Sequence, residues 1–391
     1  FSLDKLEATY SLPGAEGEEN ITSLNPTRNT FNFKSSLSLN SRYFSKLNLQ
    51  GTISEYNHAE RTGAGNNHNI TFFNDSYEFK TSLNHNSFID MNTDGLIGFH
   101  FQNYDQGALG AEESHLERTK TNSYALFALE SFNFDSFDVD VGGRLESVNL
   151  KNTNFEKGFF PGAFSSTLKK EILAHNTGFV GFDFTQRAPN PVELFANGPH
   201  HALENFESGD INLDVETSYN FSLGYNYNKD SDILKVETYY NYINDFISAD
   251  RDGNTVDVEG EDFNNVVHNQ YNALFTGLEV SGQYAFAKIS DFDILSSFMV
   301  DFIKGYRTSN NKALSRIPQT KMNLGLQMLN EYWDANLAYF HYFDKGFIGP
   351  FQTRTGGHSR LDFDLTRDFS YSDISGHLMF TATNLLNVVG R

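Results

Sequence analysis

The 391-residue sequence contains no cysteine and is poor in several other residues that build an ordinary soluble core. Without cysteine it can form neither a disulfide nor a thiolate metal site. It has one tryptophan and five methionines, and hydrophobic residues make up only 39% of the chain. No run approaches the 18 or so consecutive apolar residues that a transmembrane helix requires, so the sequence excludes that kind of membrane anchor.

Positive charge is scarce as well. The chain has 29 Lys and Arg against 50 Asp and Glu, which gives a net charge of −21. Nucleic-acid binding depends on clustered Lys and Arg, so we expect no nucleic-acid partner. An acidic balance suits metal ions or cationic ligands.

Aromatic residues, in contrast, are abundant. There are 38 Phe and 19 Tyr, and aromatics reach 15% of the chain although its mean hydropathy is only −0.47. A membrane β-barrel with an apolar, aromatic-rich outer face and a polar inner face produces this mixture directly. A soluble β-sandwich is the alternative, but its strands would usually be shorter.

Apolar and polar residues alternate with a period of two in many stretches, which is the pattern of β-strands with two different faces. One clear example is the apolar set Tyr219, Phe221, Leu223, Tyr225 and Tyr227, separated by Asn220, Ser222, Gly224 and Asn226. The pattern predicts 17 strands, at 3–10, 29–39, 45–56, 70–84, 94–104, 120–132, 136–149, 158–168, 172–187, 215–228, 233–247, 275–286, 291–304, 320–329, 333–343, 359–369 and 374–384.

The predicted connections alternate between short turns and long loops. Outer-membrane barrels have short periplasmic turns and long extracellular loops, so the first and last predicted strands both run outward. The longest loops fall at 188–214 and 248–274. Because a bacterial single-chain barrel needs an even number of strands, we expect the sequence to be a fragment.

One segment resembles a known signature. The chain reads Gln186-Arg187-Ala188-Pro189-Asn190-Pro191-Val192-Glu193-Leu194-Phe195, and later Asn212-Leu213 followed by Glu216-Thr217-Ser218. Further landmarks are Gly277-Leu278-Glu279, Arg316-Ile317-Pro318 and Asn384-Leu385-Leu386-Asn387. Their order resembles that of TonB-dependent outer-membrane receptors over nearly the whole chain.

This resemblance implies an all-β transmembrane antiparallel barrel domain over residues 1–391, with about 17 strands of a 22-strand barrel. The N-terminal plug, the first four strands and the last strand would be missing. It also implies a monomer in the bacterial outer membrane, surrounded by lipid and energised by a TonB-type inner-membrane complex through the missing plug. No resident cofactor is implied.

Within that family, the sequence is most similar to the zinc-uptake receptors. The similarity lies in Phe195–Phe206 with its Gly198-Pro199-His200, in Asp75–Glu78 and in Gly107–Gly110. The implied function is energy-coupled import of a scarce nutrient, zinc first. Haem or siderophore receptors of the same family, and a passive diffusion porin, are the alternatives.

Histidines with neighbouring carboxylates gather in the predicted outer loops. The histidines are His58, His68, His115, His200, His201, His268 and His358, and the carboxylates beside them include Glu60, Glu112, Glu113, Glu204 and Glu207. Imidazole and carboxylate are the ligands that zinc uses when no thiolate is available. The candidate metal ligands are therefore His200 and His201 first, then Glu112, Glu113 and His115. Adjacent residues of an extended segment point opposite ways, so we expect only one histidine of the pair to bind.

No catalytic motif is present. The sequence has no Gly-x-Ser-x-Gly, no His-Glu-x-x-His and no phosphate-binding glycine loop. A barrel-embedded hydrolase would need a nucleophile or paired carboxylates near a rim histidine. We therefore expect a transport protein rather than an enzyme.

Overall fold

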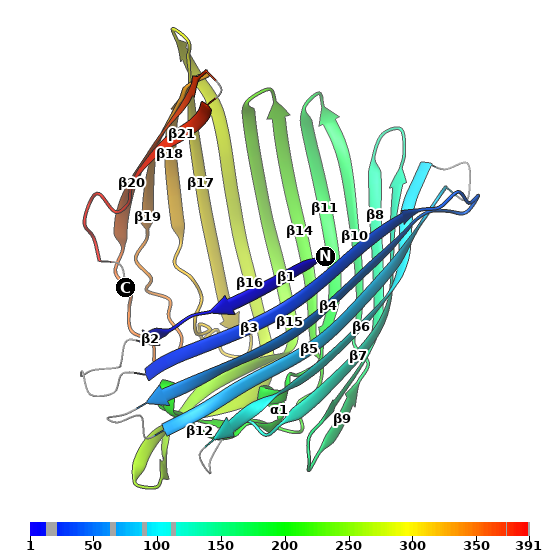
Figure 1. Cartoon of the computed structure of the whole chain (residues 1–391), viewed down its shortest axis with the longest axis vertical. Coiled ribbons are helices and arrows are strands. Elements are labelled where there is room, and N and C mark those ends of the chain that lie inside the picture. Colours follow the sequence, from blue (N-terminus) through cyan, green and yellow to red (C-terminus); the bar gives the residue numbers. More distant parts are fainter. Residues whose placement is uncertain (13–21, 63–67, 88–91, 111–114, 373, 390–391) are drawn as a thin grey trace.

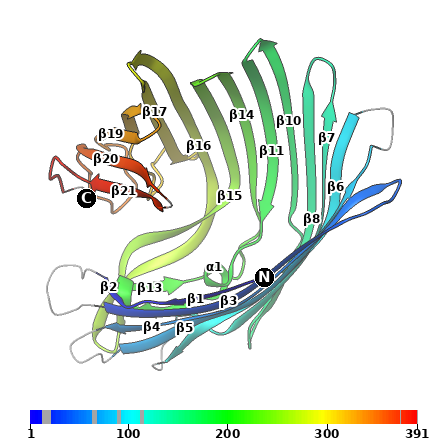
Figure 2. The same cartoon turned by 45° about the horizontal axis from the view of Figure 1, so that its top comes forward.

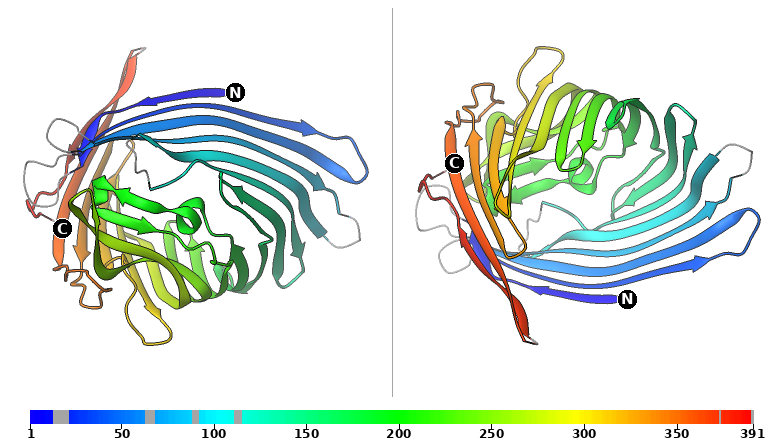
Figure 3. Two further views of the ribbon diagram at one scale, coloured as in Figure 1. Left: turned by 90° about the horizontal axis from the view of Figure 1, so that it is seen from below. Right: turned by 90° about the horizontal axis from the view of Figure 1, so that it is seen from above.

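The structure, a computed structural model, describes residues 1–12, 22–62, 68–87, 92–110, 115–372 and 374–389. Its strands belong to one 21-stranded sheet that curls around an interior space (Figures 1 and 3). The long strands of the wall follow one another in chain order, each antiparallel to the next. This arrangement confirms the predicted all-β antiparallel barrel wall.

The wall strands are Ser2–Glu7 (β1), Thr22–Ser38 (β3), Phe44–Thr62 (β4), His68–His85 (β5), Asn92–Gly110 (β6), Thr119–Asn133 (β7), Asp138–Lys151 (β8), Gly162–Leu173 (β10), Asn176–Arg187 (β11), Glu216–Lys229 (β14), Asp232–Val258 (β15), Glu261–Ile289 (β16), Phe292–Arg307 (β17), Lys321–Leu329 (β18), Trp333–Tyr342 (β19), His358–Tyr371 (β20) and Ile374–Ala382 (β21). Each corresponds to one of the 17 predicted strands. Short strands not predicted are Tyr10–Leu12 (β2), Glu156–Phe159 (β9), Asn197–His200 (β12) and Asn205–Ser208 (β13).

The two faces of the wall differ as the alternation predicts. On β14, the side chains of Phe221 and Leu223 are 54% and 57% exposed on the outer face. Asn220, the residue before Phe221, points inward, and its Nδ2 donates to Asp183 Oδ2 on β11 at 3.1 Å. The apolar face therefore meets lipid, and the polar face is hydrogen-bonded inside the barrel. Within the described residues, no helix is long and apolar enough to cross a membrane.

The prediction of a loop at 248–274 is wrong. β15 and β16 instead continue past the wall as one hairpin, which projects beyond the barrel (Figure 1). The strands meet at Glu259 and Gly260, whose φ angles are 53° and 89°. Two central residues with positive φ form the tight hairpin turn that matches the twist of antiparallel strands. Strand pairing therefore continues where a loop was expected, from Phe246 opposite Tyr271 to Val258 opposite Glu261.

The segment between β11 and β14 folds into the barrel interior rather than away from it. It contains the helix Pro191–Phe195 (α1), the hairpin of β12 and β13, and the short 3-10 helix His201–Leu203 (η1). Figures 2 and 3 show these elements inside the curve of the wall, at the end that carries the long connections. We call this segment, residues 188–214, the insertion, and that end of the barrel the mouth.

An apolar cluster holds the insertion against the inner wall. Leu194 and Leu213 of the insertion are 3% and 4% exposed, and they pack in one cluster with Leu150 of β8, Phe159 of β9 and Ile247 of β15. Fully burying one such side chain contributes about 1.5–3 kcal/mol. The insertion is thus a packed part of the fold, and it positions the residues at the mouth.

Candidate metal site at the barrel mouth

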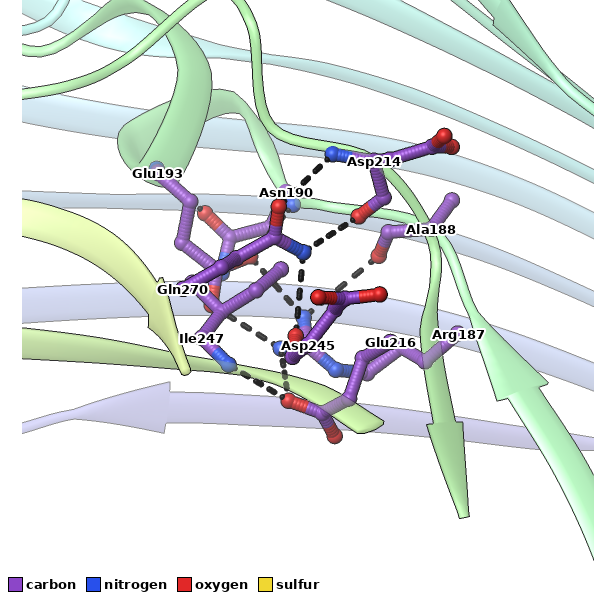
Figure 4. A network of polar contacts seen from close by, with 9 residues as sticks. All are labelled: Arg187, Ala188, Asn190, Glu193, Asp214, Glu216, Asp245, Ile247 and Gln270. Atoms are coloured by element: carbon purple, nitrogen blue, oxygen red, sulfur yellow. Dashed lines mark hydrogen bonds and ion pairs between the residues drawn. The ribbon is translucent and has the colours of Figure 1, made fainter. Parts of the chain in front are cut away.

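The first residues of the insertion are fixed by an ion-pair network at the end of β11 (Figure 4). Arg187 Nη1 and Nη2 donate to the two carboxylate oxygens of Glu193 at 2.9 and 3.2 Å, and Nη2 also donates to Glu216 at 3.2 Å. Asn190 caps α1 by accepting from Glu193 N at 2.9 Å, and Glu193 accepts from Asn190 N at 2.7 Å. Such a reciprocal capping box satisfies two backbone donors at the helix start.

The last residues of the insertion are fixed by Gln270 on β16 (Figure 4). Its Oε1 accepts from Asp214 N at 3.0 Å, and its Nε2 donates to the carbonyls of Asp214 and Asp245 at 2.8 and 2.9 Å. Asp245 lies at a bulge of β15, where the register with β16 shifts. One side chain therefore joins the end of the insertion to the wall.

The two ends of the insertion also contact each other. Gly209 N donates to Ala196 O at 2.7 Å, and Asp210 N donates to Glu193 O at 2.9 Å. A Cβ at Gly209 would lie 2.7 Å from the carbonyl carbon of Leu194, so this close approach requires glycine. The hairpin of β12 and β13 therefore projects from a closed base.

Strand pairing places His200 and Glu207 on one face of that hairpin. His200 pairs with Asn205 and Gly198 pairs with Glu207, and residues two apart on a strand share a face. β13 also pairs in parallel with β16, opposite Asn264 to Val267. On the other side, Asn197 N donates to His115 O at 2.9 Å. The hairpin thus bridges β16 and the segment that precedes β7.

These contacts bring His115, His200 and Glu207 together. Each offers a possible ligand atom, and the three atoms lie within 4.8 Å of one another. The rings of His115 and His200 stack with centroids 4.7 Å apart and planes 10° apart. His115 is 5% exposed, and its buried Nδ1 has no hydrogen-bond partner among the residues that the structure describes. We call these three residues the mouth cluster.

Side chains of β4 and β5 lie around one side of His200. His200 Nδ1 lies 3.2 Å from Glu207 Oε1, and its Nε2 lies 3.6 Å from Glu60 Oε2. Glu60 Oε1 is 3.3 Å from His58 Nε2. The Phe72 ring stacks on His58 at 4.8 Å and tilts against His115 and His200. His200 is therefore held between two carboxylates.

All these ionisable groups lie outside the predicted membrane spans, and their pKa values diverge. Burial opposes charge on His200, but its contacts with Glu207 and Glu60 outweigh burial and raise its pKa to about 9. Burial would raise the pKa of Glu60, yet its contacts with His200 and His58 lower that pKa to about 2. The contact with His200 also lowers the pKa of Glu207. Burial and the neighbouring charge of His200 lower the pKa of His115 to about 4.

The three residues of the mouth cluster are suitable metal ligands, but one of the two histidine rings must turn before both can bind one ion. Two imidazoles and a carboxylate are a common zinc donor set, with a fourth position left for water or another ligand. A nitrogen lone pair lies in the plane of its ring, so two parallel stacked rings cannot both point at one ion about 2.0–2.1 Å away. One ring must turn, and His115, which has the unpartnered nitrogen, is less constrained than His200.

The predicted metal ligands do not all lie at one place in the structure. It brings His115 and His200 together, whereas His201 faces the other way, with its ring edge-on to Phe263 at 5.1 Å and its Nδ1 3.9 Å from Glu261. Glu112 and Glu113 lie outside the described residues. Glu207 was one of several loop carboxylates in the sequence. Its position seven residues after His200 gives no signal until the turn between β12 and β13 is known.

His268 is a further buried histidine close to this site. It is 7% exposed, and neither ring nitrogen has a hydrogen-bond partner among the described residues. Burial lowers its pKa, so the ring is neutral at pH 7. It lies outside the group of three whose ligand atoms are within 4.8 Å.

Comparison with known families agrees with this architecture. The family profile described as "TonB dependent receptor-like, beta-barrel" matches residues 6–388. The chain belongs to the TonB-dependent receptor family. This receptor barrel is accordingly a protein of the bacterial outer membrane, and the prediction that it is not an enzyme agrees with membership in a family of transport receptors.

Several solved structures resemble the receptor. The copper transporter OprC has a TM-score of 0.75 and 14% identity, with 98% of this chain and 65% of that chain covered. The hemophore receptor HasR of Serratia marcescens, in complex with its hemophore HasA and heme, has a TM-score of 0.71 and 12% identity, with 94% and 63% covered. A mutant ferric enterobactin receptor PfeA of Pseudomonas aeruginosa, in complex with enterobactin, has a TM-score of 0.68 and 12% identity, with 94% and 57% covered. The chain thus spans less than two thirds of each, and the likeness is one of fold.

Proposed function

We propose that this receptor imports a transition-metal ion across the outer membrane, zinc first, and that the mouth cluster captures the ion. The observation that carries the proposal is the convergence of His115, His200 and Glu207 from two loops far apart in the sequence. Two imidazoles and one carboxylate suit zinc. The described cluster contains no thioether, the donor that favours Cu(I).

The electrostatics of the mouth favour a bare cation over the other candidate substrates. Glu60 and Glu207 flank His200 at 3.6 and 3.2 Å, and the whole chain carries a net charge of −21. Ferric catecholate complexes are anionic and would be repelled. Haem needs one axial histidine beside an extended apolar cavity, whereas His200 stands between two carboxylates. A passive porin does not fit a chain of this family.

Energy coupling is part of the proposal and rests on the family. The import step would depend on a TonB-type inner-membrane complex. Cells that make the full-length receptor should therefore accumulate zinc at limiting external concentration only when that complex is active. Uptake that is independent of it would contradict the coupled mechanism and leave metal binding to be judged separately.

Calorimetric titration of the full-length receptor in detergent with Zn²⁺ tests the site. We expect one ion bound with micromolar or better affinity. His200→Ala removes a ligand and should weaken binding by more than the roughly 10–100-fold typical of outer-shell changes. His201→Ala is the matched control, because its ring lies against Phe263 and Glu261. Equal affinity of wild type and His200→Ala would overturn the assignment.

A further inference from the structure

We propose that Glu60 is a positioning residue, which orients His200 so that Nδ1 faces the captured ion while His115 turns its ring to complete the site. This inference rests on the proposed function, because it assigns roles around the same ion. It concerns a residue that does not itself contact the metal.

The first support is the direction of the two ring nitrogens of His200. Nδ1 lies 3.2 Å from Glu207 Oε1, and Nε2 lies 3.6 Å from Glu60 Oε2. A histidine that binds metal through one nitrogen usually donates the other N–H to a carboxylate, which fixes the tautomer and the ring orientation. His200 has a carboxylate at each nitrogen. One carboxylate therefore binds the metal ion beside His200, and the other orients the His200 ring.

The positions of the two carboxylates indicate which one binds the metal ion and which one orients His200. Glu207 belongs to the group whose ligand atoms lie within 4.8 Å of one another, together with His115 and His200, and Glu60 does not. The ion therefore lies on the Nδ1 side, where His115 can also reach it. Glu60 is left on the opposite side of the ring, where its Oε2 forms an ion pair with Nε2 at 3.6 Å.

The third support is that Glu60 is itself held in place. Glu60 is 9% exposed, and its Oε1 is 3.3 Å from His58 Nε2. His58 stacks on Phe72 with centroids 4.8 Å apart and planes 14° apart. β4 and β5 thus supply a rigid chain of contacts that ends at His200, as a supporting shell must.

The last support is the contrast between the two histidines of the cluster. His200 contacts a carboxylate at each nitrogen, whereas within the described part of the chain His115 Nδ1 has no hydrogen-bond partner. The parallel stacking of the rings prevents both from facing one ion. Rotation of His115 against a fixed His200 therefore costs the fewest existing contacts.

The test uses the full-length receptor loaded with Co²⁺, whose visible spectrum reports the ligand set, and Zn²⁺ affinity measured by competition. Glu60→Ala should weaken Zn²⁺ binding about 10–100-fold, with the Co²⁺ band unchanged in position because the ligands remain. Glu60→Gln, which keeps an acceptor oxygen and the side-chain shape, should lose less. Glu207→Ala should shift or remove the band.

The outcomes separate this inference from the proposed function. Loss of the Co²⁺ band in Glu60→Gln would make Glu60 a ligand, and wild-type affinity in Glu60→Ala would remove its positioning role. Either result overturns the inference alone, provided that His200→Ala and Glu207→Ala still weaken Zn²⁺ binding. If those two variants bind like wild type, the proposed function fails first. His201→Ala serves as the control for general damage to the mouth.

Discussion

His200 carries the clearest chemical signal at the scale of single residues. Its neighbours Glu207 and Glu60 raise its pKa to about 9, so at pH 7 the ring holds a proton that a metal ion must displace. His115, with a pKa of about 4, is already neutral there. The cation on His200 thus compensates the two carboxylates until a metal ion takes over that role.

Zinc binding should therefore release about one proton per ion at pH 7. Below the His200 pKa, each unit of falling pH should weaken apparent affinity about tenfold, because metal and proton compete for the same nitrogen. The effect should persist down to about pH 5, where His115 also begins to take up a proton. Calorimetry in buffers of different ionisation enthalpy measures the released protons. A pH-independent zinc affinity between about pH 6 and pH 8 would contradict competition between the metal ion and the proton for His200.

The sequence could identify only part of this site. His115 and His200 stand out because both are histidines in predicted loops that also contain carboxylates. Glu207 and Glu60 could not be singled out, because their positions depend on strand pairing. Glu207 reaches the site because it pairs with Gly198, and Glu60 because β4 pairs with β5. The sequence predicts that only one of His200 and His201 binds, and their rings contact different partners, because His200 ends β12 and His201 begins η1.

At the scale of elements, the insertion is the part that assembles the site. Its base is closed by Arg187, Glu193 and Glu216 at one end and by Gln270 at the other. Glu193 and Glu216 are only 12% and 14% exposed, while Arg187 is 42% exposed. Removing the guanidinium would leave two nearly buried carboxylates together without their cation.

Arg187→Ala should loosen the insertion and weaken the metal site at a distance. We expect a loss of roughly 1–2 kcal/mol after allowance for the exposed guanidinium, or about tenfold in zinc affinity. Hydrogen exchange of the backbone amides in 191–214 should become faster. Arg354→Ala is the control, since Arg354 makes a similar two-oxygen contact with Asp344 in another loop. Unchanged exchange in the insertion would show that the network does not hold it.

Local periodicity predicted every wall strand but not where some of them end. The loop expected at 248–274 is a hairpin with Gly260 at its turn. β15 and β16 keep pairing there although the sequence no longer alternates, as in Asn264-Asn265-Val266-Val267. The strands of the insertion, by contrast, are too short for a period of two to be recognised. Their pairing depends on β16 and on His115, both distant in sequence.

In the whole molecule, one face of the barrel wall meets lipid and the other face lines a polar interior. Adjacent residues of β18 test this directly, because Leu326 is 49% exposed on the outer face and Gln327 donates to Asp334 on the inner side. The extent of the full barrel and the presence of a plug in the intact protein stay predictions.

Leu326→Arg should destabilise the barrel in lipid vesicles by up to about 2–4 kcal/mol, the cost of a charge on the lipid face near mid-depth. Gln327→Arg should be tolerated, since it places the charge inside and next to Asp334. Urea unfolding in vesicles, followed by Trp333 fluorescence, compares the two. Equal destabilisation by both substitutions would contradict the assignment of the faces.

One metal ion should bind at the mouth between His115, His200 and Glu207. Anomalous diffraction at the zinc edge, from crystals of the full-length receptor grown with Zn²⁺, would locate it. We predict a peak about 2.0–2.2 Å from His200 Nδ1, a His115 nitrogen and a Glu207 oxygen, with Glu60 on the far side of the His200 ring. A zinc peak elsewhere, for example between His201 and Glu261, with none at the mouth cluster, would contradict the account.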